Sequence, residues 1–113
     1  MIIKHLDGIP KVTPEMAGAA GVSLQWLFNQ KDGTEHYAMR IFEVAPGGVI
    51  PLHDHSDMEH EIFIVEGEAE LLLPGATSRI KRHDALFIKP GDQHGFRNDT
   101  DKPFKFLCVI PVL

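Results

Sequence analysis

Four of the seven histidines stand at spacings that suit a shared metal ion. His53 and His55 are separated by one residue, and alternate side chains of a β-strand point to the same face. His60 has the same parity as Ile62 and Ile64 in the apolar run that follows. If those isoleucines face the interior, three imidazoles do so too, and buried imidazoles are costly without polar partners. One divalent metal ion would satisfy all three rings.

A later segment offers a fourth ligand, because His94 follows a Pro-Gly turn and could supply another nitrogen. Neutral imidazoles suit zinc, copper, iron, nickel or manganese, and affinity alone would favour copper or zinc. Four protein ligands leave a six-coordinate ion open positions for a substrate or dioxygen. The predicted metal ligands are His53, His55, His60 and His94, and the alternative is a polar cluster that holds no metal.

The side chains expected to line a substrate pocket lie on two other predicted strands. Arg40 and Phe42 share one strand face, and Arg40 could orient an anionic substrate or simply form a structural ion pair. Phe104, Phe106 and Cys108 share a face of the last strand. The two phenylalanines are equally compatible with plain core. Cys108 is either a small buried hydrophobe or, beside a redox metal, a thiol that can be oxidised.

Other polar residues and glycines have simpler expected roles. The histidines outside the pattern are expected to be solvated: His5, His36 and His83. The acidic residues between the motif histidines form a solvated loop or hold a ligand imidazole in place: Asp54, Asp57 and Glu59. Gly91 and Gly95 are expected in turns, and Asn98 is expected to cap a loop.

The elements that must position these residues are short strands separated by glycine and proline. The predicted strands span residues 37–44, 61–65, 69–73, 77–81, 85–88, 94–97 and 104–112, and the first ends at Ala45-Pro46-Gly47-Gly48. Such strands at near-regular spacing predict an all-β sandwich or barrel. A helix is expected only near Pro14 to Ala20, with Thr13 as its cap.

Composition narrows the class of protein. A chain of 113 residues fits one domain, with residues 1–35 as extra strands and loops before a barrel at 37–112. The net charge of −5 argues against a nucleic-acid partner. We expect no membrane partner and a cytoplasmic protein, because there is no long apolar run, no signal-like N-terminus and only one cysteine, Cys108.

The paired motifs resemble those of the cupin family. The family's first motif is Gly, five residues, His-x-His, three or four residues, Glu, six residues and Gly, and its second ends in Gly, two residues, His, three residues and Asn. The matching residues are Gly47, His53, His55 and Gly67 in the first motif and Gly91, His94 and Asn98 in the second. The resemblance covers residues 37–112.

Three departures from the family pattern are visible. His60 takes the place of the motif glutamate, which makes the site resemble that of four-histidine cupins. A one-residue bulge could instead bring Glu59 or Glu61 into the site. Pro90 directly precedes the second-motif glycine, and the usual Gly-Asp turn reads His83-Asp84 here.

The resemblance implies a double-stranded β-helix, which is a jelly-roll barrel with a metal near one open end. It also implies a homodimer in which N-terminal strands add to the partner's sheet, a role open to residues Met1–Lys4 and Leu24–Phe28. Among four-histidine cupins we favour one manganese ion per chain, then iron, with nickel or zinc possible.

Three functions are compatible with these residues. The first is a manganese- or iron-dependent oxygenase or dioxygenase acting on a small organic substrate. The second is a small-molecule binder or sensor without catalysis. The third is a redox-neutral metal-dependent isomerase or lyase, with Glu59, Glu61 or Glu43 as its acid or base. Fold alone does not choose among them.

Overall fold

Eight antiparallel strands form nearly all the regular structure of the computed structural model, which describes residues 1–113. The strands are β1 (Ala20–Phe28), β2 (Tyr37–His53), β3 (His60–Glu66), β4 (Glu68–Leu73), β5 (Ala76–Lys81), β6 (Ala85–Ile88), β7 (His94–Arg97) and β8 (Phe104–Pro111). Two 3-10 turns, η1 (Leu6–Gly8) and η2 (Gln30–Asp32), flank β1. The predicted all-β class is confirmed.

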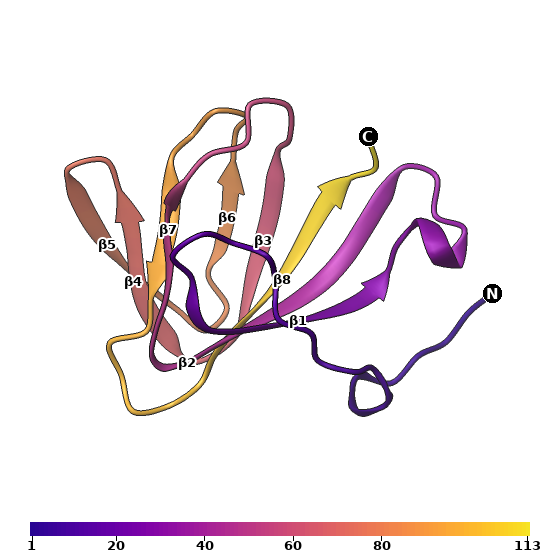
Figure 1. The fold of residues 1–113 in the computed structure, drawn as a ribbon, viewed down its shortest axis with the longest axis horizontal. Coiled ribbons are helices and arrows are strands. Elements are labelled where there is room, and N and C mark those ends of the chain that lie inside the picture. Colours follow the sequence, from indigo (N-terminus) through magenta and orange to yellow (C-terminus); the bar gives the residue numbers. More distant parts are fainter.

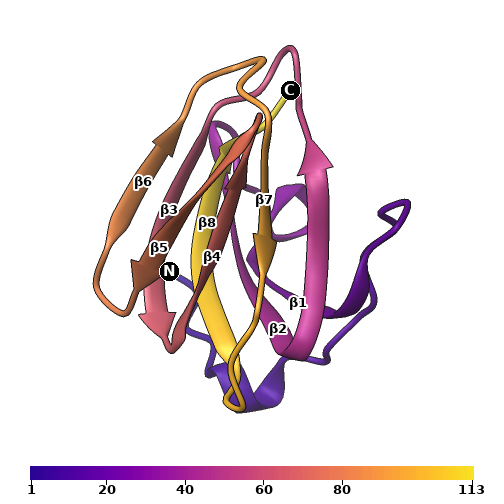
Figure 2. The same ribbon diagram turned by 90° about the vertical axis from the view of Figure 1, so that its left-hand side faces the viewer.

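The strands curl into a jelly-roll in which β2 belongs to both halves. The hydrogen-bonded order is β5-β4-β7-β2-β8-β3-β6, and β1 pairs with β2 beside this path. The first part of β2 pairs with β1 and β8, whereas its last part pairs with β7. In Figures 1 and 2, β5, β4 and β7 therefore face β6, β3 and β8 across the interior.

Two local expectations were wrong. The segment Ala45-Pro46-Gly47-Gly48 does not end the first strand, because β2 runs through it to His53 with a shift in register. The backbone there is held by the residue that follows β7, since Asn98 N–H donates to Gly48 O and Gly47 N–H donates to Asn98 O. No helix forms between Pro14 and Ala20, where the chain makes a turn and then enters β1.

The core follows the two-residue alternation of the strands. In β8 every second residue from Phe104 to Ile110 is buried, and in β3 the buried set is His60, Ile62 and Ile64. The shared parity of His60 and the two isoleucines is thus confirmed. Phe106 stacks on Phe42 with ring centroids 5.1 Å apart, which joins β8 to β2 inside the barrel.

The N-terminal residues pack along this chain's own β1. Val12 forms a β-bridge with Leu24, and the buried Gln25 donates from Nε2 to the carbonyl oxygens of Leu6 and Ile9. Residues 24–28 lie within β1 and pair with β2 of the same chain along one edge, and their addition to a partner's sheet stays a prediction. Residues Met1–Lys4 belong to no strand and project from the barrel at the right of Figure 1.

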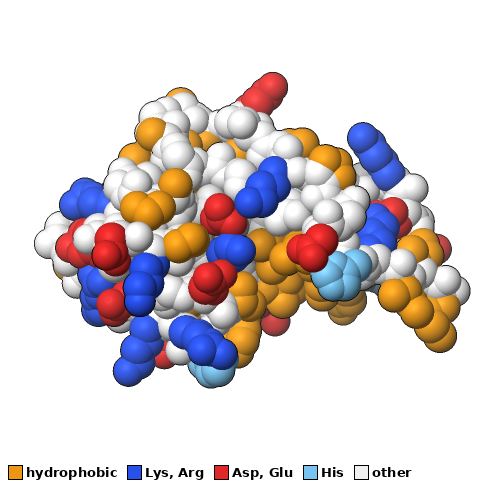
Figure 3. Space-filling view, turned by 90° about the horizontal axis from the view of Figure 1, so that it is seen from below, with side chains coloured by type: hydrophobic (Ala, Val, Ile, Leu, Met, Phe, Trp, Pro, Cys, Tyr) orange, Lys and Arg blue, Asp and Glu red, His pale blue; other side chains and the backbone are white.

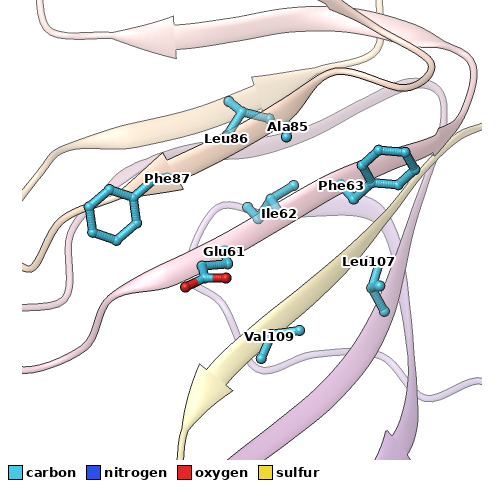
Figure 4. A pocket seen from close by; sticks show the side chains of 8 residues that line it. All are labelled: Glu61, Ile62, Phe63, Ala85, Leu86, Phe87, Leu107 and Val109. Atoms are coloured by element: carbon cyan, nitrogen blue, oxygen red, sulfur yellow. The ribbon is translucent and has the colours of Figure 1, made fainter.

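An apolar hollow lies on the outer face of β3, β6 and β8 (Figure 4). Seven of its eight lining residues are hydrophobic, and the exposed fractions of Phe63 and Phe87 are 41% and 57%. In the view from below, hydrophobic side chains also gather in the hollow middle of the molecule, and charged ones crowd one side (Figure 3). None of the helices in the structure has the length and apolar character that a membrane span requires.

Asn98 joins three segments from a fully buried position. Its Nδ2 donates to Val44 O at 2.9 Å and to Lys102 O at 2.7 Å, while its Oδ1 accepts from the backbone N–H and hydroxyl of Thr100. The expected loop-capping role of Asn98 is confirmed, and its side chain also reaches across to β2.

We predict that Asn98→Ala lowers the free energy of unfolding by about 2–4 kcal/mol, because the buried carbonyl group of Val44 loses its donor and the bonds of Asn98 to Lys102 and Thr100 are lost as well. Urea denaturation would measure this loss. The matched control is Asn29→Ala, which removes the half-buried cap of η2 and should cost about 1 kcal/mol. Equal losses in the two variants would contradict a special role for the Asn98 network.

Candidate metal centre

The structure brings the four predicted histidine ligands together at one end of the barrel. Measured between ring centroids, His53 lies 5.1 Å from His55 and 4.4 Å from His94. His60 lies 5.0 Å from His55 and 5.5 Å from His94, and the pair His55–His94 is 6.4 Å apart. Residues separated by up to 41 positions in the sequence (His53 and His94) therefore share one cluster.

These separations fit rings that share one ion. A metal–nitrogen bond of about 2.1 Å places the ring centroid about 3.2 Å from the ion. Two such rings lie about 4.5 Å apart when they meet at right angles and about 6.4 Å apart when they oppose each other. The five measured separations span this range, from 4.4 to 6.4 Å.

The donor nitrogens themselves are not yet gathered, because no three His, Cys, Asp or Glu side chains are arranged to hold an ion as they stand. Rotation about χ2 moves the imidazole nitrogens but leaves the ring centroid almost in place, and this torsion has a broad energy minimum. The centroid separations therefore decide whether the rings can converge. They are compatible with one shared ion once the rings of His55 and His60 turn, because the rings of His53 and His94 are held by backbone carbonyls.

Backbone carbonyls select the tautomer of two rings. His53 Nδ1 lies 2.8 Å from Pro51 O, and His94 Nδ1 lies 2.9 Å from Asp92 O. Because a carbonyl oxygen only accepts, each Nδ1 carries the proton and each Nε2 keeps a free lone pair. His60 differs, since its Nδ1 is buried and has no hydrogen-bond partner. A buried polar atom needs a partner, and the residues around the His60 ring are the other three histidines, whose chemistry fits a shared metal ion.

The ends of three strands position the cluster. His53 is the last residue of β2 and pairs directly with His94, the first residue of β7, while His60 begins β3. His55 lies beyond β2 rather than on it, which corrects the expected strand placement. Its carbonyl oxygen accepts from the N–H of Gly91 at 2.8 Å, and this bond ties the two motif segments together.

Gly95 is needed for the close pairing of β7 with β2. It lies within β7 and not in the turn that we expected, whereas Gly91 does lie in a turn with φ of 85°. A Cβ atom on Gly95 would stand 2.5 Å from Ile50 O and 2.9 Å from Leu52 N. A side chain there would push β7 away and carry the adjacent His94 with it.

Burial favours the neutral form of three of these histidines. It is the main cause that lowers the pKa of His60 to about 3, and the positive Arg40 and the other cluster histidines lower it further. Burial also lowers the pKa values of His55 and His94, against a raising effect of the Asp92 carbonyl on His94. Neutral imidazole is the form that binds a cation, so the cluster is prepared for one at neutral pH.

The cavity beside the histidines contains most of the predicted pocket residues. Arg40, Phe42, Phe106 and Cys108 line it, whereas Phe104 does not. Phe104 is fully buried deeper in the core against Phe96 and Phe106, so its predicted place in the pocket was wrong. Cys108 is 1% exposed, and burial raises the pKa of its thiol.

Four further lining residues were missed from the sequence: Met16, Ile50, Ile62 and Phe96. The parity shared with His60 could have identified Ile62, and that shared with His94 could have identified Phe96. Ile50 lies before a register shift in β2 that breaks its parity with His53. Met16 comes from the irregular N-terminal segment, which carries no periodic signal.

No carboxylate lines the cavity. Glu59 and Glu61 are exposed, and Glu61 lies on the outer hollow, so neither replaces His60. Glu43 faces Lys11 and Lys105 at 3.3 and 3.4 Å on the outer surface. The three glutamates proposed as an acid or base are therefore absent from the site.

The remaining residues of the motif region are solvated as expected. Asp54 and Asp57 are exposed and form no hydrogen bond with a ligand imidazole. The side chains of His5 and His36 are 81% and 78% exposed, and His83 is also exposed.

Known proteins resemble this chain along most of its length. The polyketide cyclase RemF from Streptomyces resistomycificus is 33% identical, with a TM-score of 0.94 over 98% of this chain and 79% of RemF. A cupin 2 conserved barrel domain protein from Rhodopseudomonas palustris is 29% identical, with a TM-score of 0.80 over 94% of this chain and 73% of the other.

A curated relative also has a name that refers to polyketides. The tetracenomycin polyketide synthase protein TcmJ from Streptomyces glaucescens is 28% identical over 71 residues, which are 63% of this chain and 48% of TcmJ. The chain spans about half the length of the curated relatives it matches. The Cupin_2 model, described as a cupin domain, matches residues 40–110, which hold the whole histidine cluster and most of the barrel. By fold, motif residues and family match, this chain belongs to the Cupin_2 family.

Proposed function

We propose that this chain is a metal-dependent cupin enzyme that promotes redox-neutral ring closure in a small polyketide-like substrate. The observation that carries the proposal is the clustering of four imidazoles, one with an unpaired buried nitrogen, beside a cavity walled by apolar side chains. The similarity to RemF, a polyketide cyclase, supports the class of reaction.

The proposed metal ligands are His53, His55, His60 and His94, with one divalent ion per chain, and manganese or iron remain the ions we favour. Such an ion supplies Lewis acidity, which polarises a carbonyl oxygen. The donor set alone suits several first-row metals.

The chain's own residues supply shape and exclusion of water. Phe42, Phe106 and Phe96 form an aromatic wall beside the histidines, with the centroids of Phe96 and Phe106 4.7 Å apart. Ring closure joins an acidic carbon between two carbonyl groups to a third carbonyl carbon, and the proton that the carbon loses is matched by one that the new alkoxide gains. Because no carboxylate lines the cavity, this proton exchange falls to solvent at the open end.

A redox-neutral reaction replaces the oxygenase as our first choice. The similarity to RemF supports a cyclisation reaction, and no feature of the cavity favours dioxygen over a carbonyl substrate. The absence of a lining carboxylate also disfavours an isomerase or lyase that relies on Glu43, Glu59 or Glu61.

We also propose a homodimer, with the second copy covering the outer hollow of β3, β6 and β8. The half-exposed Phe63 and Phe87 make this face too apolar to be ordinary solvent-facing surface.

Metal content is the first prediction of the proposal. Protein purified without a metal-affinity tag should carry about one divalent ion per chain, and His60→Ala should bind it at least roughly tenfold more weakly, since even loss of a residue that only supports a ligand has such an effect. Elemental analysis and metal titration would measure both. His36→Ala, at an exposed histidine, is the matched control and should bind like the unchanged protein. Equal binding by all three proteins would refute the site.

The pH dependence of the metal-free protein follows from the lowered pKa of His60. Below pH 6.5 the unfolded chain takes up a proton that the folded chain refuses until about pH 3, so stability falls as the pH falls. Between pH 6.5 and 5 the loss from this ring is about 2 kcal/mol. Urea unfolding of EDTA-treated protein should show a smaller loss in His60→Gln than in the unchanged chain; the same loss in both would place the pH sensitivity elsewhere.

Turnover separates ring closure from oxygenation. A synthetic triketide or tetraketide, supplied as the free β-keto acid, should give cyclised product at the same rate under air and under argon, without oxygen uptake. The rate should fall at least roughly tenfold in His60→Ala or after chelation, because metal binding weakens by that factor. Product is followed by chromatography and oxygen by an electrode. Oxygen consumption coupled to product would restore the oxygenase, whereas His36→Ala should behave normally.

A further inference from the structure

Arg40 carries a positive charge into the cavity without an acidic partner. Its Nε is buried and forms no hydrogen bond, and its only polar contact is a weak one from Nη2 to Cys108 Sγ at 3.9 Å. The ion pairs of the structure all join other residues. The structural ion pair considered for Arg40 from the sequence is therefore absent.

Aromatic rings fix the orientation of the guanidinium group. Arg40 Cζ lies 5.2 Å from the ring centroid of Trp26 and 4.8 Å from that of Phe42. Such contacts stabilise the cation but leave its N–H groups, which lie in the guanidinium plane, free to donate. The side chain is thus held in place by packing while most of its donors lack an acceptor.

The positive charge of the cavity favours an anionic occupant. None of its twelve lining residues is Asp or Glu, and arginine cannot lose its proton to relieve the charge. A divalent ion on the histidines would add two further positive charges to the same space. Arg40 is half-buried and its Nε is buried without a partner, so an anionic occupant would supply the counter-charge that the cavity lining lacks.

We propose that Arg40 is the anion-binding residue of this cavity and takes the carboxylate of a small β-keto acid. The planar fork of the guanidinium group matches a carboxylate and can bind both oxygens. The keto oxygen of such an acid then faces the histidines, and its carbon chain lies against Phe42 and Phe106. This inference names the substrate class of the proposed function and rests on it.

The chain contains its own reporter for the test. Trp26 is the sole tryptophan and stacks on Arg40, so an anion that binds the guanidinium group should change its fluorescence. The two probes are acetoacetate and acetoacetamide, which share a β-keto skeleton and differ in the carboxylate. Each is titrated into metal-free protein and into protein loaded with Mn²⁺, and calorimetry gives an independent dissociation constant.

The unchanged protein should bind acetoacetate roughly ten- to a hundredfold more tightly than acetoacetamide, as expected for a charge-assisted hydrogen-bonded pair. Arg40→Met should abolish this preference without changing the metal content, and Arg40→Lys should restore part of it. Arg97→Met is the matched control, because Arg97 pairs with Glu70 on an exposed surface, and it should keep the full preference. Circular dichroism checks that each variant is folded.

Three results would overturn the assignment: equal binding of the two probes, no binding of either, or a preference that survives in Arg40→Met. The last would mean that the metal alone selects the anion. Failure of the proposed function is seen separately, as protein that binds no metal or forms no ring. The Arg40-dependent preference for acetoacetate can still be measured in that metal-free protein.

Discussion

The passage of β2 from one sheet to the other is the constraint on which the site depends. Its first part places Arg40 and Phe42 between β1 and β8, and its last part places His53 against β7. A single strand thus contributes both the cationic and the imidazole side of the cavity. The passage requires the glycines at 47 and 48. Their backbone is held by hydrogen bonds to the backbone of Asn98.

The cavity is lined by four imidazoles and one arginine but by no carboxylate. Burial keeps His60, His55 and His94 neutral, and the acidic residues beside them in sequence all point outward. For Glu61 the alternation of β3 explains this, since the neighbour of an inward residue faces solvent, whereas Asp54, Glu59 and Asp92 lie in loops. An interior of this kind suits the cation that we propose on the imidazoles and the small anion that we propose at Arg40, and an internal carboxylate would compete with that anion for Arg40.

Cupin barrels carry many chemistries, so the family match alone leaves the reaction open. What distinguishes this chain is the combination of a fourth imidazole in place of a carboxylate, an aromatic wall and an unpaired arginine. A carboxylate ligand would reduce the positive charge at the centre, whereas four neutral ligands leave it undiminished. That difference favours substrates that bring negative charge, which is consistent with enolisable carbonyl compounds.

The sequence by itself determined the pattern of short strands, the all-β class and the choice of the four histidines as candidate metal ligands. It could do so because two-residue alternation and motif spacing are local properties. It did not reveal that Gly47 and Gly48 lie inside a strand, that Gly95 permits close pairing with Ile50, or that Phe104 lies behind the cavity. These depend on which strand lies next to which. Only the tertiary structure decided that Arg40 lacks a carboxylate and that Met16 reaches the site, because a side chain's partners come from distant segments that the sequence does not order in space.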